Sequence, residues 1–203
     1  MHVPSSQGLT RVALTTVAGV VAGCSDCSPA RTNLEPGAPI SAPAPTARSN
    51  EERYAGTYVY AGTDPERAAV RTAVDHATEG MVGKNIARGE LMKRAEIRPS
   101  YTIHFDGKGN VAVETPGFPS EISPVDGTEV QFKNKYGDVL QNRQHFVGSE
   151  LLQESRTHDG GGSTRFQLQP DGTTMIVTRV SQSPKLPGTV QYSLTYARRP
   201  GPR

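Results

Sequence analysis

The order of hydrophobic and polar positions divides the chain into an apolar N-terminal run, a polar stretch and a long patterned region. Residues 54–62 carry tyrosines at even spacings, which predicts a strand, and the pattern stops at Gly62. Apolar residues then recur at helical spacing from Asp64 to Met81, and again more weakly over 84–96. We therefore expect one strand followed by two helices.

From Ser100 onward, short alternating segments are separated by turn signals such as Asp126-Gly127 and Asp171-Gly172, which recur about every 10–12 residues. The expected strands are 100–106, 110–115, 119–123, 128–136, 139–147, 151–158, 163–169, 174–183 and 190–198. A long meander exposes two edges unless it closes. The predicted fold class is therefore mainly β: an antiparallel up-and-down β-barrel of about ten strands, with a helical insert after the first strand. A β-sandwich, which uses the same strand pattern, is the alternative.

The first 53 residues contain no aromatic side chain, and we expect them to lie outside the folded domain. Their apolar run over 12–23 is too short to span a membrane but matches the core of a secretory signal. It ends in Val21-Ala22-Gly23-Cys24, which resembles the bacterial lipoprotein signal motif, the lipobox. The resemblance implies a signal peptide over 1–23 and lipid attachment at Cys24, the first mature residue.

The segment that follows is expected to be a tether. Residues 28–52 contain five prolines and almost no large apolar side chain, so burial cannot offset the entropy lost on ordering. We therefore expect a lipidated N-terminus and disordered tether over 24–52, and the domain over 53–203. Cys24 and Cys27 also form a C-x-x-C pair, but a zinc site needs two further ligands. With Cys24 lipidated, Cys27 has no partner for an intramolecular disulfide.

One strand, a helical insert and nine further strands resemble the order of the intracellular lipid-binding barrels. Gly56-Thr57-Tyr58 near the first strand, and Arg198 in the last, are similar to the lipocalin signature. Both families belong to the calycin group of ligand-binding barrels. The resemblance implies a calycin-like domain in which Arg198 packs across Tyr58, beside Gly56, and closes one end of the barrel.

Two neighbouring strands, 139–147 and 151–158, have no apolar face in their middle. Either they border water on both sides, or their inner face lines a polar cavity that orients an amphipathic ligand. In the second case Arg143 would face an anionic group, with His145 beside it. Tyrosines on the last strand could also surround a ligand, although such tyrosines often serve only packing. The ligand-binding candidates are Arg143, His145, Tyr192 and Tyr196.

Composition and charge exclude function classes. With 22 basic and 20 acidic residues and no basic block, the chain does not resemble a nucleic-acid binder. No catalytic motif of the serine-hydrolase, P-loop or zinc-protease type is present, and we expect no cofactor or metal.

We therefore expect an exported, membrane-anchored lipoprotein whose barrel binds a small hydrophobic or amphipathic ligand without catalysis. Because Ser25 rather than Asp follows the lipidated cysteine, the outer membrane is expected over the inner. The alternatives are a structural lipoprotein with a filled barrel that binds a protein partner, of which the sequence indicates nothing, and a hydrolase or isomerase on the same barrel.

Overall fold

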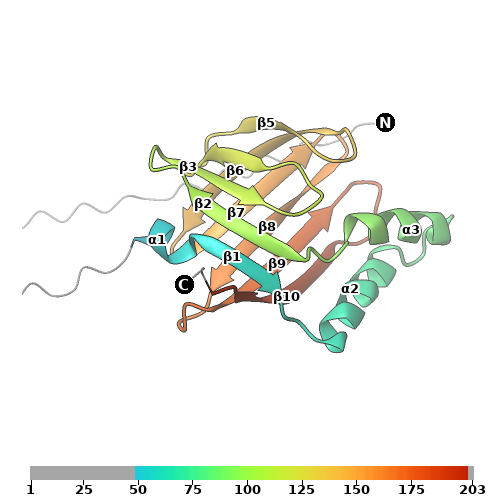
Figure 1. Cartoon of the computed structure of the whole chain (residues 1–203). Coiled ribbons are helices and arrows are strands. Elements are labelled where there is room, and N and C mark those ends of the chain that lie inside the picture. The colour runs from blue at the N-terminus through green and yellow to red at the C-terminus, as the bar shows by residue number, and fades with distance from the viewer. Residues whose placement is uncertain (1–48, 201–203) are drawn as a thin grey trace, which may run out of the picture. The chain divides into compact units, whose positions relative to one another are not determined.

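A computed structural model describes residues 49–200, and the predicted signal peptide and Cys24 lie outside them. Ten antiparallel strands form a nearly closed barrel with a helical insert after the first strand, which confirms the predicted fold class (Figure 1). The sheet order is β4-β3-β2-β1-β10-β9-β8-β7-β6-β5. The strands are β1 (Gly56–Tyr60), β2 (Ser100–Phe105), β3 (Asn110–Glu114), β4 (Glu121–Pro124), β5 (Val130–Lys133), β6 (Val139–Val147), β7 (Glu150–Thr157), β8 (Gly160–Leu168), β9 (Thr174–Gln182) and β10 (Val190–Arg198).

The described chain begins with a short helix, α1 (Asn50–Tyr54), which the sequence pattern did not reveal. Its start is fixed by a capping box, in which the Ser49 hydroxyl accepts from the Glu52 amide and the Glu52 carboxylate accepts from the Ser49 amide. Residues 50–52, at the end of the expected tether, are therefore helical, and the assignment of Tyr54 to the first strand was wrong. The tyrosine spacing was real, but Tyr54 belongs to a helix.

Tyr54 closes one end of the barrel. Its side chain is fully buried, and its hydroxyl lies 2.8 Å from the Ser149 carbonyl and 2.9 Å from the Phe166 carbonyl. The same oxygen accepts from the Leu168 amide at 3.0 Å. One side chain thus satisfies backbone groups of the β6–β7 turn and of β8.

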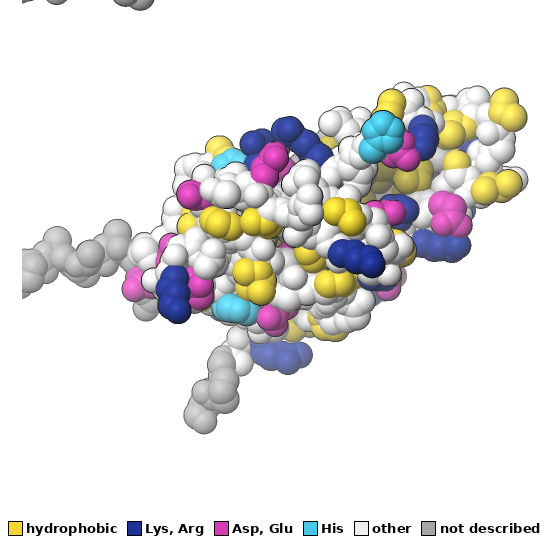
Figure 2. Space-filling model, turned by 90° about the horizontal axis from the view of Figure 1, so that it is seen from above, with side chains coloured by type: hydrophobic (Ala, Val, Ile, Leu, Met, Phe, Trp, Pro, Cys, Tyr) yellow, Lys and Arg dark blue, Asp and Glu magenta, His cyan; other side chains and the backbone are white. Residues whose placement is uncertain are grey.

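The two longer helices, α2 (Asp64–Ala77) and α3 (Lys84–Arg94), lie at the opposite end of the barrel from α1 (Figure 1). α2 buries Val70, Val74 and Ala77 in the core. α3 buries none of its residues; Val82, between the two helices, is completely exposed, and Ile86 in α3 is 77% exposed. Figure 2 shows hydrophobic side chains on the surface at this end of the molecule. No helix in the described part of the chain is both long and apolar enough to cross a membrane.

The barrel has one gap, between the edge strands β4 and β5. Near this gap, an isolated backbone bridge joins Asp126, which follows β4, to His145 on β6. β5 is shorter than the predicted strand 128–136, because the Asn134 amide donates to the Asp138 carbonyl at 3.0 Å and a tight turn begins. The gap leaves both edges without a ladder on one side.

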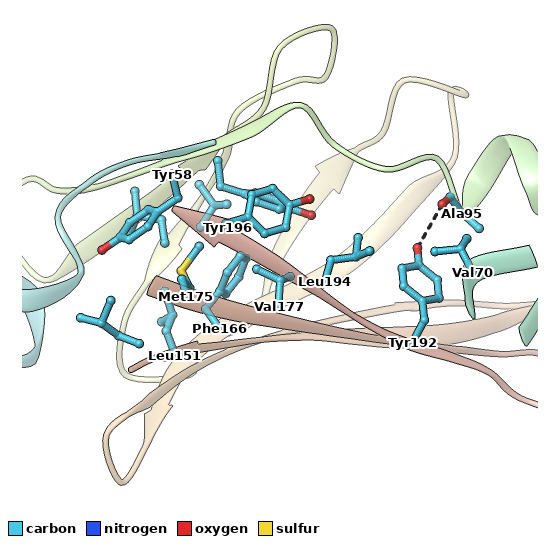
Figure 3. Packing of buried hydrophobic residues seen from close by; sticks show 14 of the residues in the cluster. Tyr58, Val70, Ala95, Leu151, Phe166, Met175, Val177, Tyr192, Leu194 and Tyr196 are labelled. Atoms are coloured by element: carbon cyan, nitrogen blue, oxygen red, sulfur yellow. Dashed lines mark hydrogen bonds between the residues drawn. The ribbon is translucent and has the colours of Figure 1, made fainter. Parts of the chain in front are cut away.

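Strand register arranges the interior in bands. One band is apolar and runs in register across five strands: Leu194, Val177, Phe166, Leu151 and Phe146. With Met175 and Tyr196 it fills the half of the barrel nearer α1 (Figure 3). Tyr101 packs edge-on against Phe166 and Tyr196, with ring centroids 5.2 and 5.1 Å apart. That half is therefore packed core.

Candidate functional site

A polar band lies next to the apolar band, two residues further along each strand toward α2 and α3. Its in-register members, from β10 to β6, are Tyr192, Arg179, Thr164, Gln153 and Gln144. Because side chains alternate between the two faces of a strand, these residues share the inward face with the apolar band. Gln144 is fully buried and Gln153 nearly so. The interior of the barrel therefore changes from apolar to polar over two residues of each strand.

Arg179 brings a positive charge into this band. It follows the buried Met175 and Val177 on the inward face of β9, and its Nη1 donates to the Tyr192 hydroxyl at 3.2 Å. Tyr192 in turn donates to the Ala95 carbonyl at 3.2 Å, just beyond α3 (Figure 3). No ion pair of Arg179 is found among residues 49–200. The Arg179 guanidinium is therefore positioned by the Tyr192 hydroxyl and not by a carboxylate.

Arg98, between α3 and β2, supplies a second guanidinium. Its backbone carbonyl accepts from the Tyr196 hydroxyl at 3.0 Å, and its side chain stacks over Phe118 with Cζ 3.1 Å from the ring centroid. Arg98 Nη1 lies 3.9 Å from a Glu96 carboxylate oxygen, too far for a hydrogen bond. Burial lowers the pKa of this guanidinium. Lys135 contacts the same Phe118 ring, with its Nζ 3.8 Å from the ring centroid.

Glu121 is the carboxyl group of the site. It lies on β4, on the same face as the buried Ser123, and its carboxyl accepts from the Gln153 side-chain amide. Gln144 donates to the Glu121 backbone carbonyl at 3.0 Å. Burial raises the pKa of the Glu121 carboxyl to about 7, although the positive charges of Arg179 and Arg98 act in the opposite direction. Near neutral pH this group therefore exists in both charge states.

We call these six residues the polar interior cluster: Arg98, Glu121, Gln144, Gln153, Arg179 and Tyr192. Four buried polar atoms in or near it have no hydrogen-bond partner in the described chain: Arg98 Nη1, Ser123 Oγ, Asn142 Nδ2 and Gln144 Oε1. Buried polar groups are normally satisfied by protein or by water. These donors and acceptors are therefore open to hydrogen bonds from water or from a ligand.

Two surface hollows lie at the end of the barrel that carries α2 and α3. One, of about 570 Å³, lies between the β7–β8 hairpin and the β9–β10 loop, whose Gly188 approaches α2 at Ala77. The other, of about 540 Å³, lies between the end of α3 and the β5–β6 turn and is lined by Lys135 and Tyr136. Neither is lined by the polar interior cluster, but Lys135 shares the Phe118 ring with Arg98.

The ligand-binding candidates predicted from the sequence are placed differently from one another. Tyr192 belongs to the polar interior cluster, whereas Tyr196 is fully buried and burial raises its pKa. Arg143 and His145 lie on the opposite face of β6 from the buried Asn142 and Gln144, because side chains alternate along a strand. Arg143 Nε donates to Glu154 on the neighbouring strand at 2.6 Å. The geometry therefore does not bring Arg143 and His145 to the interior.

The three residues expected to close the barrel lie together near α1. The Arg198 guanidinium lies over the Tyr58 ring, 5.1 Å from its centroid, and donates to the Tyr58 hydroxyl and the Arg53 carbonyl. Gly56 adopts φ +149°, and a Cβ there would come within 3.5 Å of Arg198 Nε. A side chain at position 56 would therefore strain the backbone, although a Cβ there would only be in ordinary contact with the arginine.

Three of the six cluster residues were not identified as candidates from the sequence, and two more, Gln144 and Gln153, were noted only as part of a polar face. Arg179 could have been found, because it continues the two-residue period of Met175 and Val177. Arg98 and Glu121 gave no such signal, since one lies in a loop and the other on a strand of four residues. Within residues 49–200, no group of three potential ligands is placed to hold a metal ion.

No protein-family model and no curated protein matches this sequence. Among solved structures, it is similar to fatty-acid-binding protein 1 of Echinococcus granulosus, with 12% identity over 73% of this chain and 99% of that one, at a TM-score of 0.47. It is also similar to lipid binding protein 8 of Caenorhabditis elegans (8% identity, 73% and 96% covered, TM-score 0.49) and to the fluorescent protein UnaG (13%, 73% and 98%, TM-score 0.48). At these identities and scores, nothing about a ligand carries over to this chain.

Proposed function

We propose that the barrel binds a small amphipathic molecule with an anionic head, without catalysis. The observation that carries this proposal is the pair of interior guanidiniums, Arg98 and Arg179, beside buried polar atoms that have no partner in the described chain. Planar guanidiniums bind carboxylates and similar anions through two parallel hydrogen bonds.

The unsatisfied atoms support the same proposal. Arg98 Nη1 is a donor without an acceptor, and the Gln144 side-chain oxygen is an acceptor without a donor. A head group that offers both kinds of atom would satisfy them. The alternative, a filled barrel whose outer surface binds a protein, is supported by the packed half around Phe166 but leaves these polar atoms unexplained.

We also propose that the domain is held at a bacterial membrane, preferably the outer one, through a lipid on Cys24. The support is the resemblance of Val21-Ala22-Gly23-Cys24 to the lipobox and the apolar run before it. Thioether and amine acylation would supply more than one chain, which stable anchoring needs. Residues 25–48 would then separate the barrel from the bilayer.

The binding proposal predicts that replacing Arg179 selectively weakens binding of anionic probes. In the full chain, Arg179→Gln should raise the Kd for anilinonaphthalene sulfonate by about tenfold, because loss of a hydrogen bond between charged groups costs about 1.5–3 kcal/mol. The Kd for the uncharged analogue N-phenylnaphthylamine should change less than about twofold. Fluorescence titration measures both.

Arg143→Gln is the matched control, because Arg143 is also a strand arginine but lies on the outer face with Glu154. It should leave both affinities unchanged. Equal losses in the two variants would contradict the placement of the head group beside Arg179. If neither probe binds and native mass spectrometry of the full chain never retains a small molecule, the binding function is wrong and the filled-barrel alternative stands.

The anchoring proposal predicts a lipid label that depends on one sulfur atom. In bacterial cells expressing the full chain, a palmitate analogue should label the wild type and leave Cys24→Ala unlabelled, as read on a gel after click chemistry. Cys27→Ala is the control and should remain labelled. Labelling that survives Cys24→Ala would sink the lipobox assignment.

A further inference from the structure

The larger of the two surface hollows, of about 570 Å³, has walls that the fold holds in place. One wall is the β7–β8 hairpin and the other is the β9–β10 loop. Ser183 Oγ donates to the Asp159 carbonyl at 2.7 Å, and Lys185 Nζ lies 2.7 Å from the Asp159 carboxylate. At the other end of the loop, a Cβ on Gly188 would lie 3.2 Å from the Cα of Ala77 in α2. The loop is therefore fastened at both ends, and the hollow does not need a ligand to form.

A tight turn stiffens the loop that forms the second wall. The Leu186 amide donates to the Ser183 carbonyl at 3.0 Å, and Pro184 occupies the second position of this turn, where its fixed φ is favoured. Pro184, Leu186 and Pro187 all line the hollow. A wall with few accessible conformations loses little entropy when a ligand binds. The loop therefore presents a preformed apolar surface.

The opposite wall carries an arginine whose charge is free. Arg156, near the end of β7, lines the hollow, and none of the lining residues is acidic. The acidic residues nearest to it in sequence are held by other cations: Glu154 by Arg143 at 2.6 Å and Asp159 by Lys185 at 2.7 Å. No hydrogen bond or ion pair of the Arg156 guanidinium is found among residues 49–200. The hollow therefore combines one available guanidinium with an apolar loop.

Glycines at the start of β8 keep the space beside this arginine open. Gly161 pairs with Arg156 across the hairpin, and Arg156 Cγ lies 3.6 Å from where a Gly161 Cβ would be. A Cβ there would also come within 2.8 Å of the Ser155 carbonyl oxygen, so a larger residue does not fit without movement of the backbone. The Arg156 side chain is thus exposed and lies over bare backbone. His158, which also lines the hollow, adds a ring N–H that can donate a hydrogen bond.

We propose that this hollow is a binding site for a small carboxylate that carries an apolar ring or chain. Arg156 binds the carboxylate through two parallel hydrogen bonds, and the prolines and Leu186 of the loop contact the apolar part. The volume of the hollow lies in the range that small-molecule sites occupy. The site shares no residue with the polar interior cluster, so it does not rest on the proposed function.

Two probes of the same shape and different charge test the site: 4-fluorobenzoate and its uncharged amide, 4-fluorobenzamide. With about ten non-hydrogen atoms, the carboxylate should bind the full chain with a Kd of about 1 mM, as measured by fluorine NMR titration. Arg156→Gln should raise this Kd about tenfold and change the Kd of the amide less than about twofold. Leu186→Ala should weaken both probes about threefold, because both lose the same apolar contact.

Arg165→Gln is the matched control, because Arg165 is another exposed strand arginine but does not line the hollow and pairs with Glu150 at 3.2 Å. It should leave both affinities unchanged. Equal losses in the Arg156 and Arg165 variants would show attraction by surface charge in general and overturn the inference. Binding of 4-fluorobenzoate that does not saturate below about 20 mM would overturn it as well. A loss in Arg179→Gln alone would place the carboxylate in the barrel interior, which would support the proposed function and remove this second site.

Discussion

Two tyrosines four residues apart on β10 both position an arginine, but they do so through different groups. Tyr192 accepts from the Arg179 side chain, whereas Tyr196 donates to the backbone carbonyl of Arg98. Their shared inward face could be predicted from the period of the last strand. Their arginine partners could not, because β9 register and a loop between α3 and β2 place those partners.

At the same scale, we expect the hydroxyl of Tyr54, and not only its buried ring, to contribute to the free energy of unfolding. Tyr54→Phe removes an oxygen that accepts from the Leu168 amide and donates its single hydrogen to the Ser149 or the Phe166 carbonyl. Because the Leu168 amide and one carbonyl would lose their partner, the free energy of unfolding should fall by about 1–3 kcal/mol. Urea titration followed by circular dichroism measures the loss.

Tyr60→Phe provides the comparison, because the Tyr60 hydroxyl is exposed and lies 3.5 Å from the Thr63 carbonyl. Its effect should stay within about 0.5 kcal/mol. If the two substitutions cost the same, the closing role of the Tyr54 hydroxyl is wrong and only the ring contributes.

At the scale of elements, the polar middles of β6 and β7 have a structural use that the sequence left undecided between water and a cavity. Gln144 and Gln153 reach across to β4, the edge strand that lacks a ladder on that side. Their side-chain amides replace part of the missing backbone pairing. The sequence showed that these strands lack an apolar centre, but the partner strand became known only from the closure of the barrel.

This arrangement predicts that β4 is held locally by Gln144. Gln144→Met keeps the size of the side chain but removes its bond to the Glu121 carbonyl, so amide exchange in β4 should accelerate about three- to tenfold. Exchange in β9 and β10 should not change. Hydrogen–deuterium exchange with mass spectrometry resolves the two regions.

Gln141→Met is the matched control, because Gln141 lies on the exposed outer face of the same strand β6. It should leave β4 exchange unchanged. Faster exchange throughout the barrel in the Gln144 variant would indicate global destabilisation and would contradict a local tie between β6 and β4.

For the whole molecule, strand order could be predicted because hairpin signals recur along the chain and one helical insert interrupts them. The short helix α1 could not, since its capping box at Ser49 and Glu52 follows a proline-rich segment and resembles a linker. The polar interior cluster could not be predicted from the sequence for a different reason. Its charged members, Arg98, Glu121 and Arg179, lie far apart in sequence and meet only when the ten strands curl into a barrel.

Both ends of the described chain leave the barrel at the same pole. Arg198 contacts the Arg53 carbonyl, and the Arg199 amide donates to the Thr57 carbonyl at 2.7 Å, while α2 and α3 lie at the far pole (Figure 1). A dye, a tag or a sensor chip joined directly at residue 49 or residue 200 would therefore be attached at the pole that carries α1. The helical pole, with its two hollows, would face the solution in each case.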